Sequence, residues 1–482
     1  MGNRLFLRTI VIPMVVVSLC SIQLFGSNNS SDKSAKSSLP VNSAISMQSD
    51  DAELAETSLQ SLLNFEKTLR LNYIFTGGIG EPQISLYSQE SYQGWWGRRH
   101  NLNSIPVFGN GQITLIDTAT NQTLYTNSFS TLFSEWLTTA EAKRVRKAFE
   151  NVFLIPMPCN PAMVTIKLFG IDNKLMAQFS HIVNPSDILI KPHKVVYDEM
   201  SGEVQGIEFK YIKKGGDSRD CIDVAIISEG YTAQEKEKFY RDAQISADEI
   251  MSYAPFNQFG DRFNYVALFV PSDETGVSIP NKFIWKETAL RSHFDTFYMD
   301  RYLTTLNIFR LHDYLSIVPY EHIIILANTS NYGGGGIYNS YVLSAASNEW
   351  HKPVVVHEFG HSFGALADEY FYDDEIMAQY SKEFEPWEQN ITTLSDFKSK
   401  WQDMLAPDNQ IVTKAMQGPD YLKKLSKEDY KVGLYEGGGY QSVGVYRPYP
   451  TCRMRDNTFA QFCPVCERAI QRIILFNTEE LK

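Results

Sequence analysis

Apolar and polar positions alternate with the period of β-strands through the first part of the chain. Residues 113–129 contain two such runs around a polar turn, and residues 163–183 contain two more. A helical pattern of apolar positions interrupts these strands at 138–153. Several short strands separated by turn residues are typical of a β-sandwich, so we predict one at 61–205.

The second part of the chain alternates strands with helices. A continuous apolar strand at 221–232 leads into a helical pattern at 233–251. Further apolar strands follow at 263–272 and 322–330. This alternation predicts an α/β domain with a mixed sheet over 206–482, so the whole chain is expected to be α+β.

A run of glycines at 333–336 precedes the apolar segment 337–347. We expect that segment to be an edge strand. The glycine run lacks the Lys-Ser/Thr pair of a phosphate-binding loop, so we interpret it as a mobile loop beside a groove.

The amino-terminal segment 1–26 has the pattern of an export signal. Arg4 and Arg8 supply positive charge before the apolar run 10–19, which is short for a membrane span. Cys20 leaves two alternatives open, a lipoprotein signal with a lipid anchor or a freely secreted protein. We therefore expect the periplasm, the cell surface or the medium as its location.

Composition limits the partners of the protein. Residues 27–60 are rich in Ser and Asn and predict a polar linker with too little apolar surface to fold. The 482 residues suit two folded domains, and 43% hydrophobic residues suit packed cores. A net charge of -12 without a basic stripe excludes a nucleic-acid partner. No later segment is apolar enough to cross a bilayer, and we expect a monomer.

The segment HEFGH places two histidines four residues apart. On a helix His357 and His361 project from one face, one turn apart, so both can reach a single zinc ion. Glu358 lies beside them, where a carboxylate can take a proton from a zinc-activated water. The spacing therefore predicts one catalytic zinc ion.

A catalytic zinc needs a third protein ligand and one open position. Gly364 can adopt a positive φ and end the helix, so that the chain folds back beneath the ion. The arrangement resembles the metzincins, whose motif places the third ligand six residues after the second histidine. That position is Ala367 here, which leaves Asp368 or Glu369 as the third ligand. We favour Asp368.

A gluzincin arrangement would instead take a glutamate from a later helix, where Glu383 and Glu385 are available. We disfavour this alternative because Gly364 would weaken a continuing helix.

The segments HEFGHSFGALADEY, GLYEGGGY, YRPYPTCRMR and FCPVC together resemble the IgA-peptidase family of bacterial metallopeptidases. The likeness covers roughly residues 215–475, and the preceding β-rich segment resembles the N-terminal domain of that family. Met454 stands where metzincins place a methionine turn under the zinc. The resemblance implies a metzincin-like zinc endopeptidase. The implied ligands are His357, His361 and Asp368, with Glu358 as catalytic base.

Two tyrosines are candidates for stabilising an oxyanion. Tyr446 precedes the methionine turn and is the favoured catalytic candidate, with Tyr440 as the alternative. Arg447 and Arg455 are expected to pair with acidic side chains at the surface.

Cys463 and Cys466 have the spacing of a metal-binding or redox pair, and Cys452 lies nearby in the sequence. A zinc site, thioredoxin-like redox chemistry and a structural disulfide all stay open for these three residues.

The sequence thus predicts an exported zinc-dependent endopeptidase acting on a protein or peptide, with host immunoglobulin as one candidate substrate. Two alternatives remain. One is a surface or periplasmic binding protein with a structural or vestigial metal site. The other is a zinc amidase acting on cell-wall peptide crosslinks.

Overall fold

The computed structural model describes residues 59–193, 207–372, 380–418 and 420–480. The predicted export signal, Cys20 and almost all of the polar linker lie outside these residues. Within the described ranges, no helix combines the length and the apolar character needed to span a membrane.

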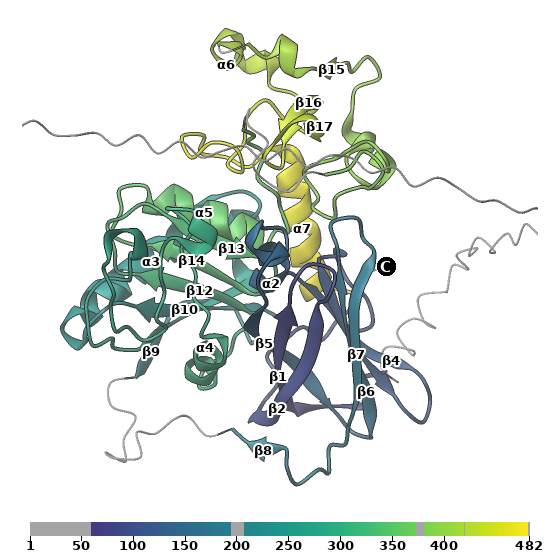
Figure 1. Cartoon of the computed structure of the whole chain (residues 1–482), viewed down its shortest axis with the longest axis vertical. Coiled ribbons are helices and arrows are strands. Elements are labelled where there is room, and N and C mark those ends of the chain that lie inside the picture. The colour runs from purple at the N-terminus through teal and green to yellow at the C-terminus, as the bar shows by residue number, and fades with distance from the viewer. Residues whose placement is uncertain (1–58, 194–206, 373–379, 419, 481–482) are drawn as a thin grey trace, which may run out of the picture. The chain divides into compact units, whose positions relative to one another are not determined.

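The amino-terminal region consists of two four-stranded sheets (Figure 1). The first has the order β5-β1-β2-β8, with strands β1 (Leu63–Gly77), β2 (Gln83–Gln93), β5 (Lys147–Pro158) and β8 (Lys191–Pro192). The second has the order β4-β3-β6-β7, with strands β3 (Gly111–Asp117), β4 (Thr123–Phe129), β6 (Ala162–Phe169) and β7 (Leu175–Val183). Apolar residues of both sheets belong to one buried cluster, among them Leu71 of β1 and Val164 of β6. The predicted hairpins at 113–129 and 163–183 are confirmed.

The prediction of a helix at 138–153 is wrong. The structure has a short helix α2 (Leu132–Trp136) before it, a single 3-10 turn at Glu141–Lys143, and then strand β5. β5 pairs antiparallel with β1 along most of its length. Lys147, Ala148 and Glu150 favour helix, but the aromatic and β-branched residues of the same segment favour a strand, and pairing with a long partner strand decides the outcome.

A six-stranded mixed sheet has the order β13-β14-β12-β10-β11-β9. Its strands are β9 (Glu208–Lys214), β10 (Ile222–Glu229), β11 (Phe263–Phe269), β12 (His322–Ala327), β13 (Gly334–Ile337) and β14 (Tyr341–Ala345). The inner strands are parallel and fully buried, as expected for continuous apolar runs, and β9 and β13 join antiparallel at the two edges. The predicted edge strand is therefore misplaced. The edge is formed by the glycine run of β13, which is a strand and not a loop, and β14 lies inside the sheet.

The two faces of this sheet pack against different partners (Figure 1). Val224 and Ile226 face a core shared with helices α3 (Lys236–Ser252), α5 (His351–Ser362) and α7 (Pro464–Thr478). Ala225 and Ile227 face the opposite core, shared with α4 (Ile308–Leu315) and the amino-terminal sheets. All the described residues belong to one compact unit. The domain boundary predicted near residue 205 stays a prediction.

The remaining elements lie between α5 and α7 in the sequence. A three-stranded sheet has the order β15-β16-β17, with strands β15 (Ile411–Val412), β16 (Leu434–Gly438) and β17 (Gln441–Arg447). A short helix α6 (Tyr421–Lys424) precedes β16. The chain is thus α+β, as predicted, with a β-rich amino-terminal region.

Candidate metal centre

Helix α5 holds two imidazoles one turn apart. Val355 and Phe359 are buried in the core beneath the helix, which fixes its rotation relative to the sheet. The four-residue spacing then brings the rings of His357 and His361 to a centroid distance of 4.8 Å.

The chain turns back directly after α5. Gly364 does not adopt the positive φ that we expected, and Ala365 does so instead, with φ of 53°. A Cβ on Gly364 would lie 2.7 Å from the carbonyl oxygen of Gly360 and 3.0 Å from Ile470 of α7, so the glycine is needed for close packing. The reversal carries Asp368 back toward the helix.

Three ligand atoms converge at this point. The Nε2 atoms of His357 and His361 lie 3.1 Å apart, and Asp368 Oδ1 lies 3.0 Å and 3.4 Å from them. A tetrahedral zinc ion with bonds of roughly 2.0 to 2.1 Å requires ligand separations of about 3.3 Å. Asp368 Oδ1 is buried and accepts no hydrogen bond from the described residues. The three residues therefore fit a bound divalent cation.

Hydrogen bonds orient both rings. His357 Nδ1 lies 3.1 Å from the carbonyl oxygen of Arg453, and His361 Nδ1 lies 2.7 Å from that of Leu366. Each Nδ1 therefore carries the proton, and each Nε2 directs its lone pair at the point of convergence. In the absence of an ion, positive charge on the imidazoles takes its place beside the carboxylate. Burial raises the pKa of Asp368, but His361 and His357 lower it by more, to well below its usual value.

Glu358 occupies the same turn of α5 and is partly exposed. Burial raises the pKa of its carboxyl group, which the two imidazoles partly oppose. The edge strand β13 packs directly on this turn. A Cβ on Gly334 would lie 2.9 Å from Glu358 Oε1, and one on Gly336 would lie 2.3 Å from the Glu358 carbonyl oxygen. The glycine run thus brings a sheet edge against the candidate base.

Side chains from distant segments surround the three ligands. The Tyr440 hydroxyl donates a short hydrogen bond to Asp368 Oδ2. Arg301 donates to the hydroxyl oxygens of Tyr370 and Tyr372. Burial lowers the pKa of its guanidinium, but the two tyrosines and the Asp368 carboxylate raise it by more. Only Tyr440 was considered from the sequence. Neither a motif nor a spacing marks Arg301.

The amino-terminal region also reaches this site. Glu135 of α2 accepts a short hydrogen bond from the Tyr302 hydroxyl. Burial raises the pKa of Glu135 to about 7. The charge of Glu358 also raises this pKa, and that of His361 lowers it. The sequence carries no signal for Glu135, because it lies far from α5 along the chain.

Met454 lies beneath α5, where a Cβ on Gly360 would approach its sulfur to 2.6 Å. Its carbonyl oxygen accepts a hydrogen bond of 2.8 Å from the Glu369 amide. The predicted methionine turn therefore packs under the helix and against the returning chain.

The other candidates lie elsewhere. Tyr446 lies in β17 and exchanges backbone hydrogen bonds with Thr392, and no hydrogen bond between described residues joins its hydroxyl to the three ligands. Its catalytic role stays a prediction. Glu385 accepts from the amide of Asp396, and among the described residues neither Glu383 nor Glu385 joins the histidines.

Two expectations about charged residues need correction. Arg447 is fully buried and donates to the carbonyl oxygens of Glu436 and Gly437, so it makes no surface ion pair. Arg455 is partly buried and donates to the carbonyl oxygen of Pro450. Glu369, the second choice for the zinc, instead lies with three cysteines.

Comparison with known families agrees with this architecture. A family model described as Peptidase M64 N-terminus matches residues 62–180, the region of the two four-stranded sheets. A second, described as IgA Peptidase M64, matches residues 211–424 and 419–474, which include the mixed sheet, α5 and the methionine turn. No curated protein matches the chain. With more than half of its length matched by the second model, the chain belongs to the IgA Peptidase M64 family of peptidases.

Proposed function

We propose that the chain is an exported zinc-dependent metalloendopeptidase with His357, His361 and Asp368 as zinc ligands. The convergence of their three ligand atoms beside Glu358 carries the proposal. Membership of a peptidase family supports peptide-bond hydrolysis. Two imidazoles and one carboxylate form a donor set suited to catalytic zinc. Export to the periplasm, the cell surface or the medium rests on the amino-terminal sequence pattern.

The residues divide the chemistry among them. When bound here, zinc supplies a Lewis acid that polarises the scissile carbonyl and lowers the pKa of water. Glu358 takes the proton from the attacking water and returns it to the leaving amine. Its raised pKa suits a group that must hold a proton between two steps. Tyr440 keeps Asp368 oriented toward the imidazoles.

The edge strand β13 is the element on which we place an extended peptide substrate. It packs against Glu358 without intervening side chains. Gly334 already exchanges backbone hydrogen bonds with Arg301 and Leu303, so the peptide would pair with the rest of the strand. We propose a protein substrate, and immunoglobulin A, named in the family description, is one to test.

A digestion experiment tests the proposal. We expect the purified protein to cleave casein or immunoglobulin A, to lose this activity with a chelator, and to regain it with zinc. Glu358→Ala should retain the metal while kcat falls about 10²- to 10⁴-fold, because the proton acceptor is gone. Glu349→Ala, at an exposed glutamate just before α5, is the matched control and should be fully active.

Other outcomes favour the alternatives. Release of peptidoglycan fragments without proteolysis would indicate a cell-wall amidase. A metal-loaded protein that hydrolyses neither substrate would indicate a binding protein. Unchanged proteolysis by Glu358→Ala would refute the role of that residue.

A further inference from the structure

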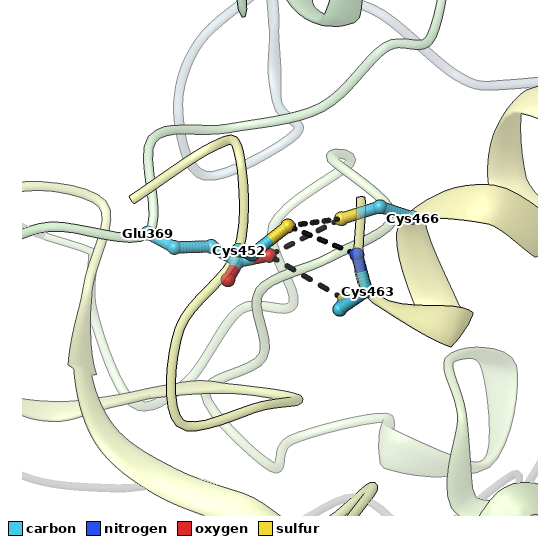
Figure 2. A group of neighbouring side chains, drawn as sticks. All are labelled: Glu369, Cys452, Cys463 and Cys466. Atoms are coloured by element: carbon cyan, nitrogen blue, oxygen red, sulfur yellow. Dashed lines mark hydrogen bonds between the residues drawn. The ribbon is translucent and has the colours of Figure 1, made fainter. Parts of the chain in front are cut away.

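A second cluster of metal-binding side chains lies apart from the first. Glu369, Cys452, Cys463 and Cys466 are all fully buried, and their ligand atoms lie within 4.8 Å of one another (Figure 2). They come from three separate segments. Glu369 follows α5, Cys452 precedes the methionine turn, and the two other cysteines begin α7.

The separations match a tetrahedral zinc site. Cys452 Sγ and Cys466 Sγ lie 3.8 Å apart. Two sulfurs bound to zinc at about 2.3 Å lie about 3.8 Å apart at the tetrahedral angle. Glu369 Oε1 lies 3.2 Å from Cys466 Sγ and 4.0 Å from Cys463 Sγ, against about 3.5 Å expected for a sulfur and an oxygen on one zinc ion. All three cysteines are free of disulfide bonds.

Hydrogen bonds from neighbouring groups reach two of the four ligands. The backbone N–H of Cys463 donates to Cys452 Sγ over 3.2 Å, at the start of α7, where the helix dipole stabilises negative charge. Asn390 donates to Glu369 Oε1 over 3.0 Å, which holds that carboxylate in place. Glu369 Oε2 is buried and has no hydrogen-bond partner among the described residues. A buried carboxylate among thiols is costly unless a cation binds it.

The charges can balance. Three thiolates and one carboxylate carry four negative charges, and a zinc ion neutralises two. Arg447 and Arg455 supply two more positive charges nearby. Burial lowers the pKa of each guanidinium, Arg455 lowers that of Arg447 as well, and the Glu369 carboxylate raises both.

We propose that Glu369, Cys452, Cys463 and Cys466 bind a second, structural zinc ion. Four protein ligands close its coordination, so it holds no reactive water and serves folding. It joins the segment after α5, the methionine turn and the start of α7. Because Glu369 directly follows Asp368 in the chain, the second ion also fixes the position of the third ligand of the first centre. The second site does not depend on peptidase activity.

Metal analysis and cobalt spectroscopy of the purified protein test this proposal. We expect two zinc ions per chain in the native protein, and one in Cys463→Ser and in His361→Ala. Cys159→Ser, at an exposed thiol, is the control and should retain both. With cobalt in place of zinc, thiolate-to-cobalt charge-transfer absorption should persist in His361→Ala and disappear in Cys463→Ser.

If Cys463→Ser does not fold, two measurements on the native protein still test the second zinc site. Thiol-reagent labelling after denaturation should find Cys452, Cys463 and Cys466 reduced, and the cobalt-substituted protein should show the thiolate absorption. A disulfide among these cysteines, or cobalt-loaded protein without that absorption, would overturn the proposal. If the native protein binds two zinc ions but shows no peptidase activity, the result would contradict the proposed peptidase function and leave the second zinc site supported.

Discussion

The residues nearest the candidate zinc are held by partners that carry no charge of their own. The Tyr440 hydroxyl holds Asp368, and two backbone carbonyl oxygens hold the rings of His357 and His361. Such partners orient the ligands, and the carbonyl oxygens also increase the basicity of the imidazoles, so their loss weakens metal binding without removing a ligand.

Tyr440→Phe isolates this contribution. Loss of one hydroxyl should weaken zinc binding about 10- to 100-fold, measured by competition with a chromophoric chelator. Tyr446→Phe is the comparison, because its hydroxyl makes no described contact with the ligands. Equal zinc affinity in Tyr440→Phe and the native protein would contradict a supporting role. A fall in kcat with zinc affinity intact in Tyr446→Phe would support the predicted oxyanion role.

At the residue scale, the sequence could predict only those site residues that lie close together along the chain. His357, Glu358 and His361 share one helical turn, and Asp368 follows within a short reversal. The proximity of Glu135, Arg301 and the cysteine cluster depends on segments that only tertiary packing brings together. The sequence alone could not decide between Asp368 and Glu369 for the same reason. The two residues are adjacent in the chain, but Asp368 lies with the histidines and Glu369 with the cysteines.

At the scale of single elements, β13 and α5 form a pair that depends on the absence of side chains. The glycines let the sheet edge approach the helix backbone at the turn that carries Glu358. We interpreted these glycines as a loop, and glycine is indeed rare in strand interiors. Close contact with α5 explains why this strand needs them.

Gly336→Ala tests the contact. Its Cβ would lie 2.3 Å from the Glu358 carbonyl oxygen, so the strand or the helix must move. We expect a loss of about 1 to 3 kcal/mol in unfolding free energy from overpacking, and a fall in kcat/KM of on the order of 10²-fold from displacement of the base. Thermal unfolding and peptidase assays measure these effects. Gly418→Ala, where a Cβ meets no neighbour, should change neither quantity, and native-like values for Gly336→Ala would disprove the tight contact.

At the scale of the whole molecule, the amino-terminal sheets take the place of a helical layer on one face of the mixed sheet. The shared core joins the two regions, and polar contacts reinforce it. Arg70 of β1 is buried and donates to Asp313 Oδ1 over 2.5 Å and to the Phe309 carbonyl oxygen over 2.8 Å, both in α4. The family-level likeness and the β-rich character were predictable from the sequence. The docking of the two regions was not, because it depends on which faces remain uncovered.

Arg70→Met should destabilise the whole molecule. Removing one partner of a buried ion pair costs about 3 to 5 kcal/mol, and we expect about 2 to 3 kcal/mol because water can reach Asp313, whose side chain is 26% exposed. Urea unfolding followed by far-ultraviolet circular dichroism and by peptidase activity should give coincident transitions, both shifted to lower urea. Arg144→Met, at an exposed arginine, is the control. Two separate transitions in the native protein would show that the regions unfold independently.

Asp368 and Glu369 are adjacent in the chain, and this adjacency restricts the length of the segment that follows His361. Inserting or deleting a residue between His361 and Glu369 would draw one carboxylate away from its partners, whichever way the loop adjusted. Loop lengths elsewhere on the surface tolerate change far more readily. Among natural variants of this protein, this short connection should therefore keep a constant length.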